Sequence, residues 1–316
     1  NGVTIKNINF LSVAAGVGSA GTSMISCYAT NTVIDNCVFF SSPTTVNDTM
    51  SSFINVLALG TTKITVRDCT FSGPYASVFQ TTAGAIELSC ISMVDDVNLD
   101  LRRITDNKMS QCDVGIIFNG RSIITGNSIT AYRNAIVERS ASGTDSTGSI
   151  IANDTFILSV SGTTTPVSGV GFTGLGGAGV IIDGNYFRNT TASTYGIAIN
   201  IAPAAVMNNT LISNNIINFW DSGIVLSANA QNGFVRDNVI QNTTPAITDS
   251  GTGNFTTIQT AEITDLAVTP PKMAARPAGK MDRVGGPDIA NNTLTTIAFN
   301  NSVFNVGGAL APTLNT

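Results

Sequence analysis

The sequence contains no histidine. Its absence excludes Ser-His-Asp and Cys-His catalysis, imidazole acids and bases, and histidine metal ligands. Charged residues are also scarce, at 11% of the chain, which is less than half their usual share. Carboxylates are therefore the main groups left for acid and base chemistry.

Basic surface is lacking as well. The net charge is −5 and the pI is near 4.6, so the chain would repel a phosphate backbone and has no basic stripe to release counterions. No apolar run approaches the ~18 residues that cross a bilayer. We therefore expect neither a nucleic-acid partner nor membrane insertion. The first residues, Asn1-Gly2-Val3, resemble neither an initiator Met nor a signal peptide, and we expect the chain to begin inside a repeat.

Cysteine is present in an odd number and without a Cys-x-x-Cys pair. The five residues are Cys27, Cys37, Cys69, Cys90 and Cys112. This pattern argues against a disulfide scaffold and against a zinc site. We expect free, buried thiols with a structural role, and neither a metal nor a cofactor.

The chain has a repeat instead. A six-residue pattern, apolar-x-(Asn, Asp or Gly)-(small or Asn)-x-apolar, recurs at intervals of 20 to 38 residues. Its nine copies are Ile5–Phe10, Ile34–Phe39, Val66–Phe71, Ile104–Met109, Ile124–Ile129, Ile151–Phe156, Ile182–Phe187, Ile212–Ile217 and Val235–Ile240. A second apolar position, usually preceded by Gly or Ala, follows at Ile54, Ile86, Ile116, Ile136, Val170, Ile197, Ile224 and Ile247.

Short strands that repeat in this way must stack on their own copies to bury their apolar faces. The apolar spacing of two and the many β-branched residues exclude helices, and a sandwich or barrel does not need one residue class to return at one place. The sequence predicts an all-β, right-handed parallel β-helix of about nine rungs. Asn107, Asn127, Asp154, Asn185, Asn215 and Asn238 should then form a ladder with ~4.8 Å between rungs.

The Ile-x-Asp-Asn-x-Phe repeats resemble those of pectin-lyase-like right-handed β-helices, including phage tailspikes and polysaccharide depolymerases. The resemblance covers about residues 2–253. It indicates the fold far more strongly than an activity, because this scaffold hosts lyases, hydrolases, epimerases and binding proteins.

A change of composition marks the C-terminal part. Residues 254–290 are expected to form a linker, in which Ala261–Ala274 is similar to segments that join domains in phage tail fibres, and Pro270 and Pro271 exclude a regular helix. Residues 291–316 resemble the start of a C1q-like jelly roll. These strands could clasp neighbouring chains, and the resemblance to tail fibres implies a homotrimer.

Candidate catalytic residues are carboxylates near the third to fifth rungs. Glu87 should point outward in Ile86-Glu87-Leu88, close to Asp95, Asp96 and Asp100. Glu138 aligns with inward-facing Leu88, Phe118 and Phe172, so it either turns outward at a bulge or is partly buried with a raised pKa. Groups one rung apart would be ~5 Å apart, as in retaining glycosidases, and groups two rungs apart ~10 Å, near the inverting range.

Arg102, Arg103, Tyr132 and Arg133 complete the candidate site as residues that line a substrate groove. The alternative interpretation is that all these charges are ordinary solvated groups on a sheet face.

Three functions remain open. The leading hypothesis is a tailspike or receptor-binding protein, on a virion tail or otherwise extracellular, that binds a cell-surface polysaccharide and in a catalytic form hydrolyses it as a depolymerase. The alternative is a non-catalytic structural or adhesin β-helix, and the third is a secreted polysaccharide lyase, which the scarcity of Lys and the lack of His disfavour. Acidic and aromatic side chains clustered on one face would favour an enzyme, and uniform Thr, Ser and Asn faces an adhesin.

Overall fold

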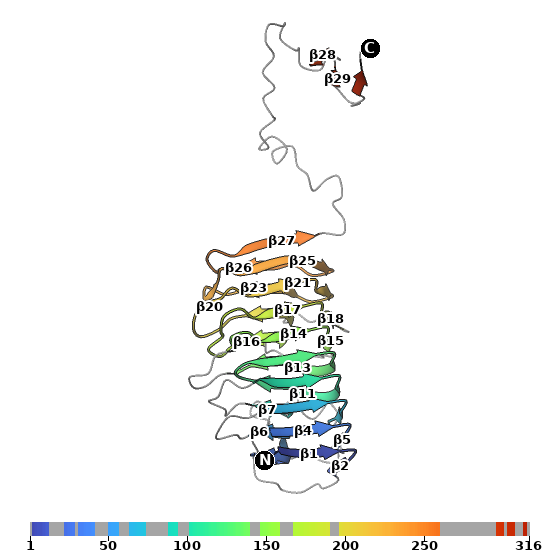
Figure 1. Cartoon of the computed structure of the whole chain (residues 1–316), viewed down its shortest axis with the longest axis vertical. Coiled ribbons are helices and arrows are strands. Elements are labelled where there is room, and N and C mark those ends of the chain that lie inside the picture. Colours follow the sequence, from blue (N-terminus) through green and yellow to red (C-terminus); the bar gives the residue numbers. More distant parts are fainter. Residues whose placement is uncertain are drawn as a thin grey trace. The chain divides into compact units, whose positions relative to one another are not determined.

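The computed structural model describes residues 2–12, 22–28, 31–41, 50–56, 63–73, 88–93, 101–139, 146–158, 167–189, 196–259, 295–299, 302–306 and 312–314. The chain divides into two compact units, Asn1–Ala261 and Glu262–Thr316. The first is the predicted right-handed parallel β-helix, in which every pairing between its strands is parallel among the residues described. Figure 1 shows its turns stacked along one axis from β1 and β2 to β27.

Each turn of the coil contributes strands to three faces, which we name A, B and C. Face A consists of β1 (Gly2–Lys6), β4 (Asn31–Asp35), β7 (Lys63–Arg67), β10 (Arg102–Thr105), β12 (Ser122–Thr125), β14 (Ile150–Ala152), β17 (Ile181–Asp183), β21 (Leu211–Ser213), the start of β25 (Phe234–Gln241) and β27 (Phe255–Gln259).

Face B follows after the turn that contains the repeated Asn or Asp. It consists of β2 (Asn9–Ser12), β5 (Val38–Ser41), β8 (Thr70–Ser72), the first halves of β11 (Lys108–Phe118) and β13 (Ser128–Glu138), β15 (Thr155–Leu158), β18 (Tyr186–Asn189), β22 (Ile216–Asn218) and the end of β25.

Face C completes each turn. It consists of β3 (Thr22–Cys27), β6 (Met50–Val56), β9 (Ser89–Met93), the second halves of β11 and β13, β16 (Val167–Phe172), β19 (Gly196–Ile201), β23 (Ser222–Leu226) and β26 (Ile247–Asp249). A short ladder of β20 (Met207–Asn208) and β24 (Ala230–Gln231) supplements the last turns.

The predicted end of the coil at residue 253 is too early. β27 pairs in parallel with β25, so the coil continues at least to Gln259. The second unit contains a three-stranded antiparallel sheet of β28 (Thr295–Phe299), β29 (Ser302–Val306) and β30 (Pro312–Leu314). Among the described residues there is no helix long and apolar enough to cross a membrane.

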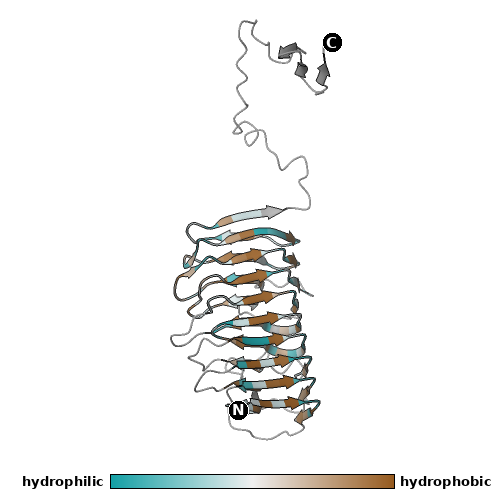
Figure 2. Ribbon diagram, viewed as in Figure 1, coloured by the Kyte–Doolittle hydropathy of each residue, from teal (hydrophilic) through white to brown (hydrophobic). Residues whose placement is uncertain are grey.

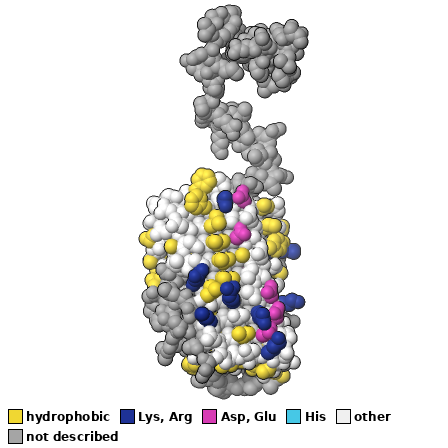
Figure 3. Space-filling model, in the orientation of Figure 1, with side chains coloured by type: hydrophobic (Ala, Val, Ile, Leu, Met, Phe, Trp, Pro, Cys, Tyr) yellow, Lys and Arg dark blue, Asp and Glu magenta, His cyan; other side chains and the backbone are white. Residues whose placement is uncertain are grey.

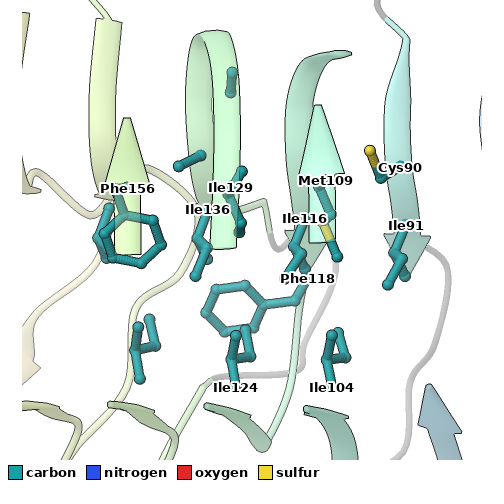
Figure 4. Packing of buried hydrophobic residues seen from close by; sticks show 14 of the residues in the cluster. Cys90, Ile91, Ile104, Met109, Ile116, Phe118, Ile124, Ile129, Ile136 and Phe156 are labelled. Carbon is teal, nitrogen blue, oxygen red and sulfur yellow. The ribbon is translucent and has the colours of Figure 1, made fainter. Parts of the chain in front are cut away.

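The core lies inside the coil, where alternate strand residues point. Figure 2 shows hydrophobic residues returning at the same places on successive turns. Phe10, Phe39 and Phe71 stack with ring centroids 4.8 and 4.7 Å apart and nearly parallel planes. Figure 4 shows Ile124 of face A, Met109 and Ile129 of face B, and Ile116 and Phe118 of face C around one interior. Burying each such side chain contributes roughly 1.5–3 kcal/mol.

Small residues at the corner between faces B and C make this packing possible. The Gly or Ala before the second apolar position points into the core, where a larger side chain has no room. A Cβ on Gly169 would lie 2.6 Å from the Ala198 carbonyl oxygen and 2.6 Å from the Phe187 ring. The residue before the second apolar position therefore stays small in most rungs, because the backbone of the next rung lies too close for a larger side chain.

The Asn ladder at the turn between faces A and B is confirmed. The N–H and Nδ2 of Asn107 donate to Oδ1 of Asn127 at 3.0 and 2.9 Å, and Asn185 and Asn215 repeat the pattern toward the next rung. Each Nδ2 also donates to a carbonyl of the preceding rung, for example Asn185 to Ile151 at 3.0 Å. The ladder thus satisfies backbone and side-chain groups that are about 99% buried.

The residue before each ladder position carries the strain of the turn. Asn7, Asn36, Asp68, Asp106, Asn153, Asn214 and Asp237 have φ between 50° and 58°, and Gly126 and Gly184 have 72° and 66°. Asn, Asp and Gly tolerate this left-handed conformation better than other residues do. The third position of the repeat is therefore set by backbone geometry, and the fourth by buried hydrogen bonds.

All five cysteines are free and buried, as predicted. Cys37 and Cys69 continue the ladder toward the N-terminus: the Cys37 N–H donates to Cys69 Sγ at 3.4 Å, and the Cys69 N–H to Asn107 Oδ1 at 3.0 Å. Burial raises the pKa of the Cys27 and Cys69 thiols to about 11. These thiols stay protonated at neutral pH, which fits a structural role.

Replacing Asn215 or Asn185 with Leu should lower the free energy of unfolding by about 1–3 kcal/mol, because buried N–H and carbonyl groups lose their partners. Urea unfolding curves would measure the change. Asn31→Leu is the matched control, since Asn31 is exposed on the outer side of β4. Parent-like midpoints in both ladder variants would contradict a stabilising role for the ladder.

Candidate functional site

Half of the predicted site lies outside the described residues. Glu87, Asp95, Asp96 and Asp100 all belong to this group. The backbone of Tyr132 lies in β13, but its side chain is likewise outside the description. The catalytic role proposed for these carboxylates therefore stays a prediction.

The register of face C differs from the expected one in the rung that contains Glu87. The inward position of that rung was assigned to Ile86, but Ile91 of β9 pairs with Ile54 of β6 and Ile116 of β11. Four rungs further on, Ile199 and not Ile197 pairs with Val170. Apolar residues follow each other closely in both stretches, so alternation alone left the register of the strand ambiguous. Leu88 is buried in the core, and because Glu87 lies outside the described residues, its outward direction stays a prediction.

Arg102 does not line a surface groove. It lies on the inner side of β10 with 0% of its surface exposed, although a groove residue had been predicted. Its Nη1 donates to the carbonyl oxygen of Asn119 and, at 2.8 Å, to Asn119 Oδ1. Arg102 takes the inward position that Ser122 takes on the next strand. Arg103, its neighbour, points outward and is exposed.

Glu138 is fully buried, so the alternative in which a bulge turns it outward is wrong. It ends β13 between Phe118 and Phe172, which pair with it in register. Leu88 is not in this column, because Met93 pairs with Phe118. Glu138 Oε2 accepts a hydrogen bond of 2.8 Å from the Gly174 N–H. With no exposed surface, its carboxylate has no access to a polysaccharide.

Arg133 is committed to an ion pair that the sequence did not indicate. Its Nε donates to Asp113 Oδ1 at 3.0 Å, and its Nη2 pairs with Asp113 Oδ2. Asp113 is 2% exposed. It lies two residues after Gln111, where a φ of 57° and a shift in register make β11 irregular. Because two parallel bonds fix the guanidinium, Arg133 serves the corner between faces B and C.

Carboxylates are widely separated on the outer sides of the described strands. The outward rows of faces B and C contain none. On face A, Asp35 of β4 and Asp183 of β17 have four strands between them, which is ~24 Å at ~4.8 Å per rung. Glycosidase carboxyl groups lie ~5–9.5 Å apart. Asp35 also pairs with Lys6 and Arg67, both at 3.0 Å.

One closer pair occurs at the turns. Asp68 and Asp106 follow Arg67 and Thr105, which are register partners, so their turns are one rung apart. Both side chains are exposed. Their surroundings therefore lack the contrast between a buried acid and a solvated base that catalytic pairs use. In the part of the chain that the structure describes, no three His, Cys, Asp or Glu residues are grouped to hold a metal ion.

Comparison with known proteins supports the fold. No family model and no curated protein matches the chain. Among solved structures it is similar to PfbA, a surface adhesin of Streptococcus pneumoniae, with a TM-score of 0.51 and 16% sequence identity. The likeness covers 78% of this chain and 61% of the PfbA chain. At this identity it shows a shared fold only.

Asp154 is one of four buried carboxylates among the described residues, together with Asp35, Asp113 and Glu138. It occupies a ladder position that Asn fills in the neighbouring rungs, and its Oδ1 accepts from the N–H and Nδ2 of Asn127 at 2.6 and 2.9 Å. Among the described residues its Oδ2 has no hydrogen-bond partner. Burial, and to a lesser degree the charge of Asp106, raises the pKa of Asp154 to about 7.

The free energy of unfolding of the coil should therefore fall as pH rises from about 4 to about 7. The unfolded chain releases this proton near pH 4 and the folded chain near pH 7, so the stability contributed by the neutral acid is complete below about pH 4 and is lost by about pH 7. Between pH 4 and pH 7 this group should change the free energy of unfolding by on the order of 2–4 kcal/mol. The Asp154→Asn variant should lack that change. Urea midpoints from pH 4 to 8.5 test it, and parallel pH profiles for parent and variant would refute the assignment.

Proposed function

We propose that this chain is the rigid coil of an extracellular, non-catalytic binding protein of the adhesin type. The observation that carries the proposal is the outer surface of face C. Among the described side chains of β6, β9, β11, β13, β16, β19, β23 and β26, its outward rows hold Ser, Asn, Thr, Gly and aliphatic residues, of which Val114, Ile117 and Val137 are buried as a second apolar cluster, and no charged or aromatic side chain. These rows offer no general acid, and no base that could activate the Ser and Thr hydroxyls as nucleophiles.

The fold shared with a surface adhesin agrees with this proposal. It also agrees with display outside the cell, where a stack of identical turns forms a stiff spacer. The protein that carries the coil could belong to a cell surface or to a virion tail, as the sequence resemblance to tailspikes suggests.

The proposed ligand is a cell-surface polysaccharide that lies along face B. The outward rows of this face combine Tyr186 and Arg188 of β18 with Thr130, Asn218 and Gln241 on neighbouring turns. An aromatic ring with hydrogen-bonding groups around it is the usual composition of a small-molecule or sugar contact. Repetition of strands at ~4.8 Å intervals along the coil suits a polymer of repeating units.

A glycan array on the whole chain, followed by product analysis of each bound polysaccharide, tests the proposal. We expect binding without any shortening of the polymer. New reducing ends would show hydrolysis and an unsaturated product a lyase, and either would overturn the non-catalytic proposal. In that event Glu87→Gln, with Glu262→Gln as control, would test the predicted catalytic carboxylate.

Tyr186→Ala should weaken binding to the identified polysaccharide at least tenfold, which corresponds to about 1.4 kcal/mol of binding free energy. Tyr28→Ala is the matched control, because Tyr28 is 67% exposed at the end of β3. Titration calorimetry measures both. Equal affinities for the two variants would move the binding site away from face B.

A further inference from the structure

Face A carries a column of apolar side chains on its outer side, which we name the outer column. Register pairs join its members strand to strand over six successive turns. They are Ile123, Ile150, Ile181, Leu211, Phe234 and Phe255. The sequence contains its signature: the residue before the first apolar position of the repeat is itself apolar in five consecutive copies. Sequence reasoning had used only the inward residue of each such pair.

Solvent reaches this column. Its four aliphatic members are half-buried by their neighbours in the sheet, while Phe234 and Phe255 are 52% and 57% exposed. The two rings lie with centroids 6.4 Å apart. None of the six belongs to the core cluster inside the coil. Figure 3 shows hydrophobic side chains following the coil on the visible face. A contiguous apolar patch of this kind usually marks an interaction site.

The chemistry of the column fits a protein surface better than a glycan. Its side chains offer no hydrogen-bond donor or acceptor, and four of the six are aliphatic. The partner must therefore supply a matching straight apolar ridge. An identical column on another copy of this chain has the same ~4.8 Å repeat, so side chains of two copies can interdigitate turn by turn.

We propose that the outer column is the contact through which two copies of this chain associate side by side, with their coil axes parallel and pointing the same way. Toward the N-terminus the column continues as Arg103, Thr65, Val33 and Thr4. An antiparallel arrangement would press Arg103 against the partner's apolar residues and desolvate its charge. The parallel arrangement places apolar side chains against apolar ones over all six turns of the column, and its cost is confined to one turn, where Arg103 lies opposite the partner's Arg103.

The area of face A is sufficient for a stable contact. The column alone, ~24 Å long, offers only a few hundred Å². The ten strands of the whole face span ~43 Å, and two or three outward positions per strand, ~6.8 Å apart, give a width of about 15 Å. Two copies would thus bury roughly 1,300 Å², which is within the range of specific protein interfaces. This assigns self-association to the coil and not to the strands after Asn291.

Light scattering on the full chain, over a concentration series, tests the proposal. The parent should have a mass of at least two copies, and Ile181→Lys should raise the dissociation constant at least tenfold. Ile197→Lys is the matched control, since Ile197 is an equally half-buried, outward residue on face C. Phe255→Lys repeats the test at a more exposed position that the coil tolerates more easily. Parent-like unfolding midpoints confirm that each variant is folded.

Orientation is tested by Ile181→Cys, because all five native cysteines are buried. In the parallel arrangement Cys at position 181 meets its own copy, and mild oxidation should yield a disulfide-linked dimer, whereas Ile197→Cys should not. A monomeric parent at about 100 μM would overturn the proposal. Equal association of the Ile181→Lys and Ile197→Lys variants, or no cross-link at position 181, would overturn it as well.

Discussion

Satisfaction of buried amides at the turn between faces A and B is the constraint on which the rest of the structure depends. Closing a coil around an apolar interior places backbone N–H and carbonyl groups where water does not reach them. The Asn side chain solves this problem in both directions, since its Oδ1 accepts from the rung before and its Nδ2 donates to the rung after and to a carbonyl. An apolar residue there would leave several groups without partners.

This constraint fixes the register of the whole coil. Because the ladder residues must align, the left-handed residue before each one must align too, and so must the apolar residues three positions before and two positions after it. The loops between the faces are then free to vary in length, which explains why the repeat tolerates spacings from 20 to 38 residues. Faces A and B, which flank the ladder, are consequently the most regular. Of the three faces, face C lies farthest along the chain from its nearest ladder residue.

The same reasoning explains which features could be predicted from the sequence. The ladder, its cysteine continuation and the inward residues beside it follow from a pattern with defined positions. Face C lacks such a marker, so Ile86 and Ile197 were placed where Ile91 and Ile199 lie. Arg102 was unpredictable for another reason: alternation puts it inside, but a charged side chain is normally read as exposed. Its partner Asn119 follows the far end of β11 and is recognised only in three dimensions.

The hydrogen bonds that join one ladder residue to the next all run one way. From Cys69 to Asn238 each rung donates toward the C-terminal neighbour and accepts from the N-terminal one. The stack is therefore polar along its axis, with aligned amide dipoles like those of an α-helix. Its two ends are chemically different, because one presents donors and the other acceptors. A coil of this kind can be lengthened or shortened by whole turns without breaking the chain of dipoles. A segment inserted in the reverse direction would place ladder N–H groups opposite one another at one of its ends.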